Sequence, residues 1–348
     1  MKKIADIWKT ICFMFILLNC GQLYGQENIN ERLSKSAYNK GIEQIRKQNF
    51  TEAEACFNKS ISLDNKNYLT YLQRGKVKAK LNNPADALSD LYKALSLKND
   101  LGEAFFAIGA IQVGLKKYNE AYVNFSKSIQ YGFKDPMLYY LKGVIDLHKK
   151  DYSTALVDFS LAIEQQDDFA YAYHDRAAAK FKLNDLQGAM RDYLEAINYN
   201  PQMASAYSNL GSVKTKSGDF KGAVEDYTKA IKMQPNNYIS LNNRGYVKYQ
   251  LGDFQGAIDD FNQSLTLKKD YTYALNNLAI AKNKINDPQA AYEAFSKAVQ
   301  IDNDFGTAYL NRGCVSELMG NIDSACQDWH KAQDLGIKEA SAYIKECK

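Results

Sequence analysis

The stretch Leu241–Phe261, LNNRGYVKYQLGDFQGAIDDF, occurs in closely related forms elsewhere in the 348-residue chain. It returns as YLQRGKVKAKLNNPADALSDL at Tyr71–Leu91 and as YLNRGCVSELMGNIDSACQDW at Tyr309–Trp329. Shifting the chain by 34 residues aligns it with YSNLGSVKTKSGDFKGAVEDY at Tyr207–Tyr227. Self-similarity at one fixed period predicts a stacked array of small structural units.

Each repeat has the pattern of two helices joined by a tight turn. Tyr207, Leu210 and Lys214 follow one another at spacings of three and four, which places them on one face of a first helix. Gly218 then marks the turn. Gly, Asn or Lys occupies this place in every repeat except the first, which has Gln48. Gly and Asn tolerate the left-handed conformation that closes a helix.

The residue after the turn predicts where the second helix begins. An Asn or Asp side chain there accepts a hydrogen bond from the free amides of the first helical turn. Lys117 is the exception among the nine repeats, and Pro84 and Pro288 follow at the first helical position, where a missing amide has no cost. The expected caps are Asn49, Asn83, Asp151, Asp185, Asp219, Asp253, Asp287 and Asn321.

Small residues recur where the two helices of a repeat would touch. Glycines such as Gly211 and Gly245 lie on the first helix, and alanines such as Ala223 and Ala257 lie on the second. Large aromatic residues on the second helix would fill the space beside them. A single helix pair leaves an apolar edge exposed, so neighbouring repeats are needed to bury it.

This pattern resembles the tetratricopeptide repeat, with its small residues at fixed places in a 34-residue unit. The resemblance implies an all-α, right-handed α-solenoid. We expect a signal peptide at 1–25, a linker at 26–33, nine repeats over 34–339 and a C-terminal capping helix at 340–348. The repeats are expected at 34–67, 68–101, 102–135, 136–169, 170–203, 204–237, 238–271, 272–305 and 306–339.

Four repeats carry an Arg on the first helix and an Asp sixteen residues later on the second. We expect ion pairs that join the two helices, with contact between the Arg and a ligand as the alternative. Repeats with Ile108 or Leu278 at the Arg position lack the acid as well, and Asp226 stands opposite Leu210 without an Arg. The pairs are Arg74 and Asp90, Arg176 and Asp192, Arg244 and Asp260, and Arg312 and Asp328.

First-helix positions that do not pack in the repeat line the inner groove in the family that this chain resembles. From residue 204 onward these positions are rich in Asn and Tyr, and a row of Asn side chains can pair with the backbone of an extended peptide. The alternative is that Asn serves there only as a soluble residue. The predicted peptide-binding residues are Asn209, Asn242, Asn243, Tyr246, Tyr249, Tyr273, Asn276, Asn277 and Asn311.

Earlier repeats predict a different lining. Phe106, Tyr140, Leu141 and Val144 should form an apolar floor large enough for a partner protein to dock on. We therefore expect a non-catalytic scaffold that binds a protein or an extended peptide. The alternative is a structural assembly factor that acts through the edges of the solenoid or through self-association; the sequence does not fix the oligomeric state.

Composition and motifs argue against two other functions. Lys plus Arg number 44 against 40 Asp plus Glu, with no basic block, so no nucleic-acid partner is expected. The three His residues, His148, His174 and His330, lie in separate repeats without a nucleophile, phosphate-loop or metal-ligand motif. We expect no catalytic residues, metal or cofactor, and we interpret His174 as a solvated side chain.

The N-terminus resembles an export signal. Lys2 and Lys3 precede an apolar run at 11–18, which is too short to span a bilayer. Cleavage after Gly25 would release a mature chain, whereas Cys20 resembles the acylated cysteine of bacterial lipoproteins, although Asn19 departs from that motif. We expect a periplasmic or cell-envelope protein, attached to the membrane only if Cys20 carries a lipid.

Two cysteines near the C-terminus are candidates for a disulfide. Cys326 lies in the last repeat and Cys347 in the expected capping helix. An oxidising compartment would permit a bond between them, and two separate thiols are the alternative.

Overall fold

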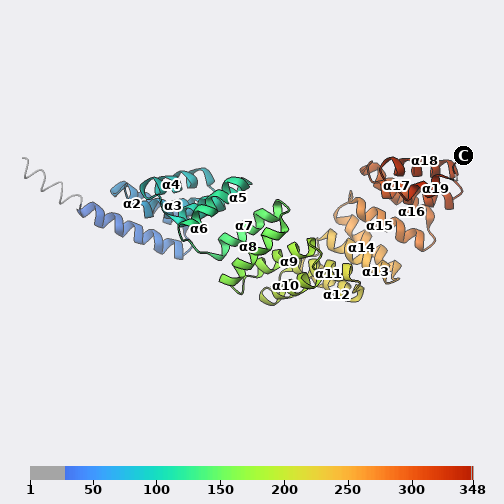
Figure 1. Ribbon diagram of the computed structural model, residues 1–348, viewed down its shortest axis with the longest axis horizontal. Helices are drawn as coiled ribbons and strands as arrows, with labels where there is room; N and C mark the ends of the chain where they lie inside the picture. The colour runs from blue at the N-terminus through green and yellow to red at the C-terminus, as the bar shows by residue number, and fades with distance from the viewer. Residues whose placement is uncertain (1–27, 346, 348) are drawn as a thin grey trace, which may run out of the picture. The chain divides into compact units, whose positions relative to one another are not determined.

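The computed structural model describes residues 28–345 and residue 347. The predicted signal peptide at 1–25, including Cys20, lies outside these residues. All regular secondary structure in the described part is helical, which confirms the predicted all-α class (Figure 1). After a helical segment at 28–46, the helices are α2 (Phe50–Leu63), α3 (Tyr68–Lys80), α4 (Pro84–Leu97), α5 (Gly102–Gly114), α6 (Tyr118–Gln130), α7 (Pro136–His148), α8 (Tyr152–Gln165), α9 (Ala170–Lys182), α10 (Leu186–Tyr199), α11 (Ala204–Ser217), α12 (Phe220–Met233), α13 (Tyr238–Gln250), α14 (Phe254–Leu267), α15 (Thr272–Lys284), α16 (Pro288–Ile301), α17 (Gly306–Leu318), α18 (Ile322–Asp334) and α19 (Ala340–Ile344).

Each expected repeat contains one first helix and one second helix. The chain divides into two compact units, one ending at Lys149 and the other beginning at Lys150, so α7 and α8 belong to different units. Within each unit, consecutive helices contact each other, and second helices also contact the first helix of the next repeat. None of the helices in residues 28–345 has the length and apolar character needed to cross a membrane.

The two ends differ from the prediction. Residues 28–33, expected as part of a linker, are helical and continue into the first repeat, because the segment Asn28–Leu33 contains neither Gly nor Pro to interrupt a helix. The capping helix is shorter than expected: α19 ends at Ile344, and Cys347 lies beyond it. A helix of five residues is too short to be stable alone, so it depends on packing against the last repeat.

The predicted turn is present in all nine repeats. The residue that closes each first helix has a positive φ, from 58° at Lys116 to 85° at Gly218 and Gly252. This left-handed residue is what reverses the chain direction between the helices of a pair. Gln48, Lys116 and Lys150 adopt the conformation at a steric cost that Gly and Asn avoid.

Most predicted caps are also confirmed. Asp185 Oδ1 accepts a hydrogen bond from the Gly188 amide at 2.8 Å, and five other repeats show the same arrangement. Asn49 and Asn321 were predicted as caps, but neither side chain caps its helix. The amide of Asn49 donates instead to Gln44 Oε1 at 2.9 Å.

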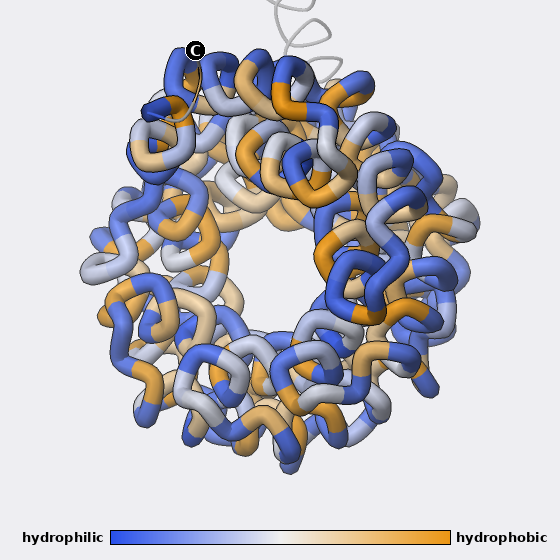
Figure 2. The backbone as a smooth tube through the Cα atoms, turned by 90° about the vertical axis from the view of Figure 1, so that its right-hand side faces the viewer, coloured by the Kyte–Doolittle hydropathy of each residue, from blue (hydrophilic) through white to orange (hydrophobic). Residues whose placement is uncertain are grey.

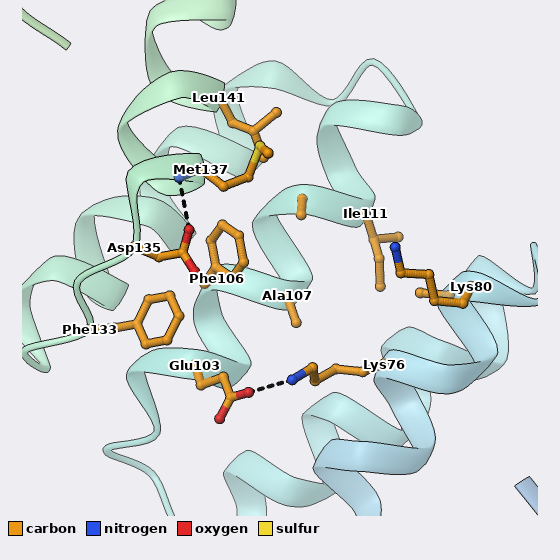
Figure 3. A pocket seen from close by; sticks show the side chains of 12 residues that line it. Lys76, Lys80, Glu103, Phe106, Ala107, Ile111, Phe133, Asp135, Met137 and Leu141 are labelled. Atoms are coloured by element: carbon orange, nitrogen blue, oxygen red, sulfur yellow. Dashed lines mark hydrogen bonds and ion pairs between the residues drawn. The ribbon is translucent and has the colours of Figure 1, made fainter. Parts of the chain in front are cut away.

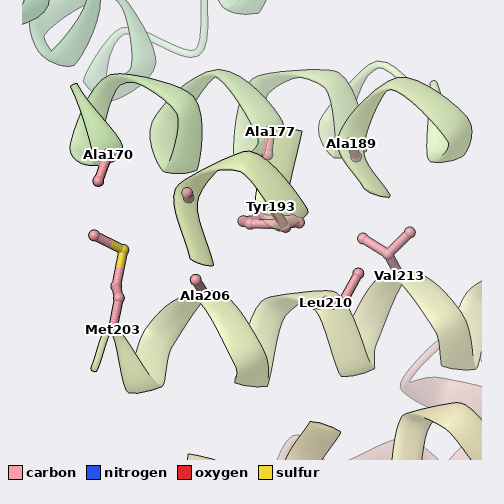
Figure 4. Close-up of a cluster of buried hydrophobic side chains, with 9 residues drawn as sticks. Ala170, Ala177, Ala189, Tyr193, Met203, Ala206, Leu210 and Val213 are labelled. Carbon is pink, nitrogen blue, oxygen red and sulfur yellow. The ribbon is translucent and has the colours of Figure 1, made fainter. Parts of the chain in front are cut away.

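Close contacts between small and large residues form the core of each repeat. A Cβ atom added at Gly245 would lie 2.7 Å from Phe261 Cε1, and one at Gly109 would lie 2.6 Å from Phe125 Cε1. Between α9, α10 and α11, Tyr193 packs among alanines and against Leu210 of the next repeat (Figure 4). Hydrophobic and hydrophilic stretches follow one another closely along the chain, as the tube in Figure 2 shows. The core is therefore a series of small clusters, each shared by neighbouring helices.

Candidate functional site

The predicted ion pairs join the two helices of a repeat. Arg74 Nε and Nη2 donate to Asp90 Oδ2 and Oδ1 at 2.7 and 2.6 Å. The same bidentate contact with the Asp partner is made by Arg176, Arg244 and Arg312. Asp90 and Asp260 are only 5% and 3% exposed, so each carboxylate depends on its protein partners for charge compensation.

A second cation, not predicted from the sequence, contacts three of these four carboxylates. Lys78, one helical turn after Arg74, places its Nζ 2.9 Å from Asp90 Oδ2, and Lys180 and Lys248 contact their Asp residues in the same way. The spacing of four residues between Arg and Lys was the available signal. In the repeat at 204–237, which has Leu210 at the Arg position, Lys214 pairs with Asp226 at 2.6 Å, and burial raises the pKa of that carboxyl.

The predicted Asn row is present, but its members bond mainly to one another. Asn277 Nδ2 donates to Asn242 Oδ1 at 3.0 Å, and Asn311 Nδ2 donates to Asn276 Oδ1 at 3.4 Å. Both bonds join first helices of adjacent repeats. Asn242 and Asn276 are 5% and 8% exposed, so they lie in the contact between repeats and not on an open face, contrary to the expectation that they bind peptide.

His174 takes the place of an Asn in this row. Its Nε2 lies 3.1 Å from Asn209 Nδ2, its Nδ1 lies 2.7 Å from Asp175 Oδ1, and its ring meets the edge of Tyr193. The interpretation of His174 as a solvated side chain was therefore wrong. Because the imidazole accepts the hydrogen bond that an Asn oxygen accepts in later repeats, it serves the same contact between repeats.

The side chains that remain accessible beside this row are mostly aromatic. Tyr246 and Tyr273 are 42% and 61% exposed, while Asn277 is half-buried. Tyr246, Tyr249 and Asn277 line one small hollow of about 120 Å³ together with Phe261 and Ile280. The structure thus brings together three of the predicted peptide-binding residues. Asn209, Asn243 and Asn311 are half-buried, and Tyr273 lies outside the hollow.

A larger cavity lies among three first helices of the N-terminal unit. Its volume is about 490 Å³, and its walls come from α3, α5 and α7 and the segment before α7 (Figure 3). Phe106 and Phe133 stack at a ring separation of 5.2 Å on one side, and Ala107 and Ala110 leave space in the floor. Met137, which is 40% exposed, also lines the cavity.

Charged side chains surround this apolar floor. Lys76 Nζ pairs with Glu103 Oε1 at 2.5 Å, which joins α3 to α5 across the cavity wall (Figure 3). Asp135 Oδ1 accepts from the Met137 amide at 2.8 Å and caps α7. Lys80 also lines the cavity, beside Ile111. The acidic groups are therefore engaged in the structure, and the ammonium of Lys80 lies beside apolar surface.

The predicted apolar floor agrees with this cavity in part. Phe106 and Leu141 line it, whereas Tyr140 and Val144 do not. Phe133, which is not on a first helix, was missed because the helix period gives no information about loop residues.

The C-terminal end of the last repeat is tied to α19. Cys326 and Cys347 form a disulfide with a Cα separation of 5.7 Å. Tyr343 stacks on Trp329 at 5.2 Å, and Ala340 is buried. These contacts hold the short helix over the end of the array.

Within the described residues, no group of three or more His, Cys, Asp and Glu side chains is arranged to hold a metal ion. The polar groups on the first-helix faces are amides, phenols and paired charges. This chemistry is suited to recognition of polar and apolar groups.

Repeated helix pairs stacked in this way define an α-solenoid, whose stability comes from contacts between neighbouring repeats. Models of the tetratricopeptide repeat match residues 34–67, 204–237, 226–259 and 272–305, and a TPR repeat model matches 179–218. These segments of the chain are therefore tetratricopeptide repeats.

Solved structures agree with this assignment. The Cut9–Hcn1 structure is 16% identical, with a TM-score of 0.57, over 90% of this chain and 75% of that one. PilF of Pseudomonas aeruginosa is 18% identical, with a TM-score of 0.55, over 61% of this chain and 97% of that one. PilW, described as a type IV pilus biogenesis factor, is 18% identical, with a TM-score of 0.56, over 60% and 98%. At these identities the similarity establishes the fold alone. No curated protein matches the chain.

Proposed function

We propose that this protein is a non-catalytic scaffold that binds a partner protein through the first-helix faces of its repeats. The observation that carries the proposal is the cavity between α3, α5 and α7. A fold that needs only close packing would fill this space, yet Ala107 and Ala110 leave it open beside Phe106.

The cavity fits an apolar side chain of a partner. Its volume of about 490 Å³ lies within the range of ordinary ligand sites, and its floor is aromatic and aliphatic. Lys76 and Glu103 at the wall supply the polar rim that surrounds the apolar centre of many protein interfaces. We infer that one or two apolar residues of an extended segment insert here.

The exposed tyrosines and half-buried Asn side chains of the C-terminal unit provide a second contact of different character. Because Asn277 and Asn311 already donate to Asn242 and Asn276, each has one amide hydrogen and its carbonyl oxygen left for a peptide backbone. Tyr246 and Tyr273 add flat contact area. We expect this contact to contribute less to binding than the cavity does, since Asn242 and Asn276 of the row are buried.

Filling the cavity tests the proposal. Ala110→Trp places an indole in the space that the partner would occupy, and Ala85→Trp adds the same group at an exposed position on α4 as the matched control. After crosslinking in native cells, mass spectrometry should identify a partner with the wild type and with Ala85→Trp that is lost with Ala110→Trp. Equal recovery with all three proteins would contradict binding in the cavity and favour an assembly role through other surfaces.

We also propose that the protein is exported to the bacterial cell envelope. The apolar run at 11–18 supports export, and the disulfide between Cys326 and Cys347 is of the kind that persists in oxidising compartments. Labelling with a palmitate analogue, compared between wild type and Cys20→Ala, distinguishes a lipid anchor from simple cleavage. A label that depends on Cys20 supports the anchor, and a label-free protein with Gln26 at its N-terminus supports cleavage.

A further inference from the structure

The four Arg residues of the ion pairs also reach the preceding repeat. Arg74 Nη1 donates to Asn58 Oδ1 at 2.8 Å, and Arg244 Nη1 donates to Thr228 Oγ1 at 3.2 Å. Arg176 and Arg312 donate in the same way to Ser160 and Ser296. Each Arg therefore occupies a space bounded by three helices, and the polar residue that receives its third bond lies sixteen positions earlier.

The repeat at 272–305 lacks the Arg that occupies this space in four other repeats. Leu278 stands at the Arg position and Ala294 at the Asp position. A hollow of about 460 Å³ is found here, lined by both residues and by Asn262, which corresponds to the polar residue that receives the third Arg bond elsewhere. The hollow is thus the site of a missing ion pair.

The cation of the ion pair remains after its carboxylate has gone. Lys282 lines the hollow at the position where Lys78, Lys180 and Lys248 contact their Asp partners at 2.7 to 2.9 Å. Lys282 Nζ instead lies 3.5 Å from Asp287 Oδ2, whose other oxygen caps α16. Lys269 and Lys297 also line the hollow against a single acid, Glu293, so its charge is positive.

Apolar groups form the rest of the wall. Leu265, Leu275 and Leu278 contribute aliphatic surface, and the small side chains of Ala290 and Ala294 leave room between α15 and α16. The lining includes second helices of two repeats, so this hollow differs from the first-helix faces used in the proposed function. A positive site beside aliphatic surface is complementary to an amphiphilic anion.

We propose that this hollow binds a small organic carboxylate with a short aliphatic stem. The ligand carboxylate takes the place of the missing Asp and pairs with Lys282, while its stem contacts Leu275 and Leu278. The volume of about 460 Å³ accommodates such a molecule. The proposal does not depend on the partner-binding role of the cavity in the N-terminal unit.

Thermal unfolding of the full chain tests this binding with three probes at equal concentration. Octanoate has both the carboxylate and the stem, octanol lacks the charge, and acetate lacks the stem. Because a ligand that binds only the folded state stabilises it, octanoate should raise the melting temperature by about 2 °C or more, and the other two should not. Equal shifts with octanol and octanoate, or no shift with octanoate, would overturn the proposal.

Two variants locate the site. Leu278→Arg with Ala294→Asp rebuilds the ion pair found in four other repeats, so it should fold at least as stably as wild type and lose the octanoate shift. Lys282→Met keeps an aliphatic side chain and removes the cation. In this variant octanoate should raise the melting temperature no more than octanol does. Lys248→Met is the matched control, because its repeat has an intact Arg244 and Asp260 pair, and it should retain the octanoate shift. An octanoate shift that persists in the rebuilt variant would show that the ligand binds elsewhere and would contradict the proposal.

Discussion

The adjacent repeats at 238–271 and 272–305 have the same helix pair but hold it together differently. The first contains Arg244 bonded to Asp260, with Lys248 as a second cation. The second has Leu278 and Ala294 at the same positions and a hollow beside them. Both pairs pack closely, with Ala257 and Ala291 fully buried. The small-residue contacts therefore build the repeat, and the ion pair occupies a space that a repeat can leave open.

Breaking the ion pair in the first of these repeats should have the largest effect. Arg244→Leu leaves Asp260, which is 3% exposed, with Lys248 alone, so we expect a loss of about 3 kcal/mol in the free energy of unfolding. Chemical denaturation monitored by circular dichroism measures it. Arg244→Leu with Asp260→Ala copies the next repeat and should cost clearly less than Arg244→Leu alone. An equal cost for the two variants would mean that the charges do not act as a pair.

The helix contact offers a second comparison. Gly245 faces Phe261, whereas the corresponding Ala279 is buried in the next repeat. Gly245→Ala puts a Cβ 2.7 Å from Phe261 Cε1, so crowding should cost about 1 to 3 kcal/mol despite the better helix propensity of Ala. The comparison variant Ala279→Gly should cost about 1 to 2 kcal/mol, because it lowers the helix propensity and also removes a buried methyl group. A stabilising Gly245→Ala would show that α13 and α14 can separate freely.

The hydrogen bond from Asn277 to Asn242 joins the repeats at 238–271 and 272–305, and it can be removed separately. Asn277→Ala leaves the buried Asn242 oxygen without the donor that lies 3.0 Å away, and the cost should be about 1 to 2 kcal/mol. Asn311→Ala removes a longer bond of 3.4 Å and should cost less. Adding Asn243→Ala to Asn277→Ala also tests peptide contact. Partner recovery that is unchanged in the double variant, under conditions where it is fully folded, would exclude these side chains from binding.

The repeat at 204–237 contains the Asp of the ion pair, Asp226, but not the Arg. The pH dependence of stability should show the effect of the missing Arg. Burial raises the pKa of Asp226 in the folded protein above its ordinary value of 3.8. Folding is therefore favoured while this carboxyl is neutral. Its contribution to the free energy of unfolding is fully present below the pKa of Asp226 in the unfolded chain, and it is lost as pH rises through the pKa of Asp226 in the folded protein. Unfolding measured from pH 3 to pH 7 should show Asp226→Asn gaining stability relative to wild type as pH rises, by less than about 1.4 kcal/mol per pH unit. A constant difference across this range would contradict the shift.

The fold could be predicted from the sequence because the residues that determine it are local and periodic. The turn at Gly218, the cap at Asp185 and the pairing of Arg244 with Asp260 each depend on residues at fixed spacing within one repeat. Asn242 was misplaced because it lies one residue before Asn243, and a rotation of roughly 100° turns it from the open face into the contact between helices.

The site was harder to predict for a related reason. The helix period does not predict that the loop residue Phe133 lines the cavity. It also does not predict that His174 stands in the row at a position where later repeats have Asn. The missing pair at Leu278 and Ala294 is visible in the sequence, but whether the neighbouring side chains collapse into the space depends on packing.

The proposed function depends above all on a partner protein that binds in the first-helix cavity of the N-terminal unit. Site-specific photocrosslinking in native cells tests it most directly, with p-benzoylphenylalanine at Met137, which lines the cavity, and at Val123, which is 55% exposed on α6. We predict a discrete crosslinked product of defined mass from position 137 and none from position 123. The same product from both positions, or none from position 137, would contradict the account.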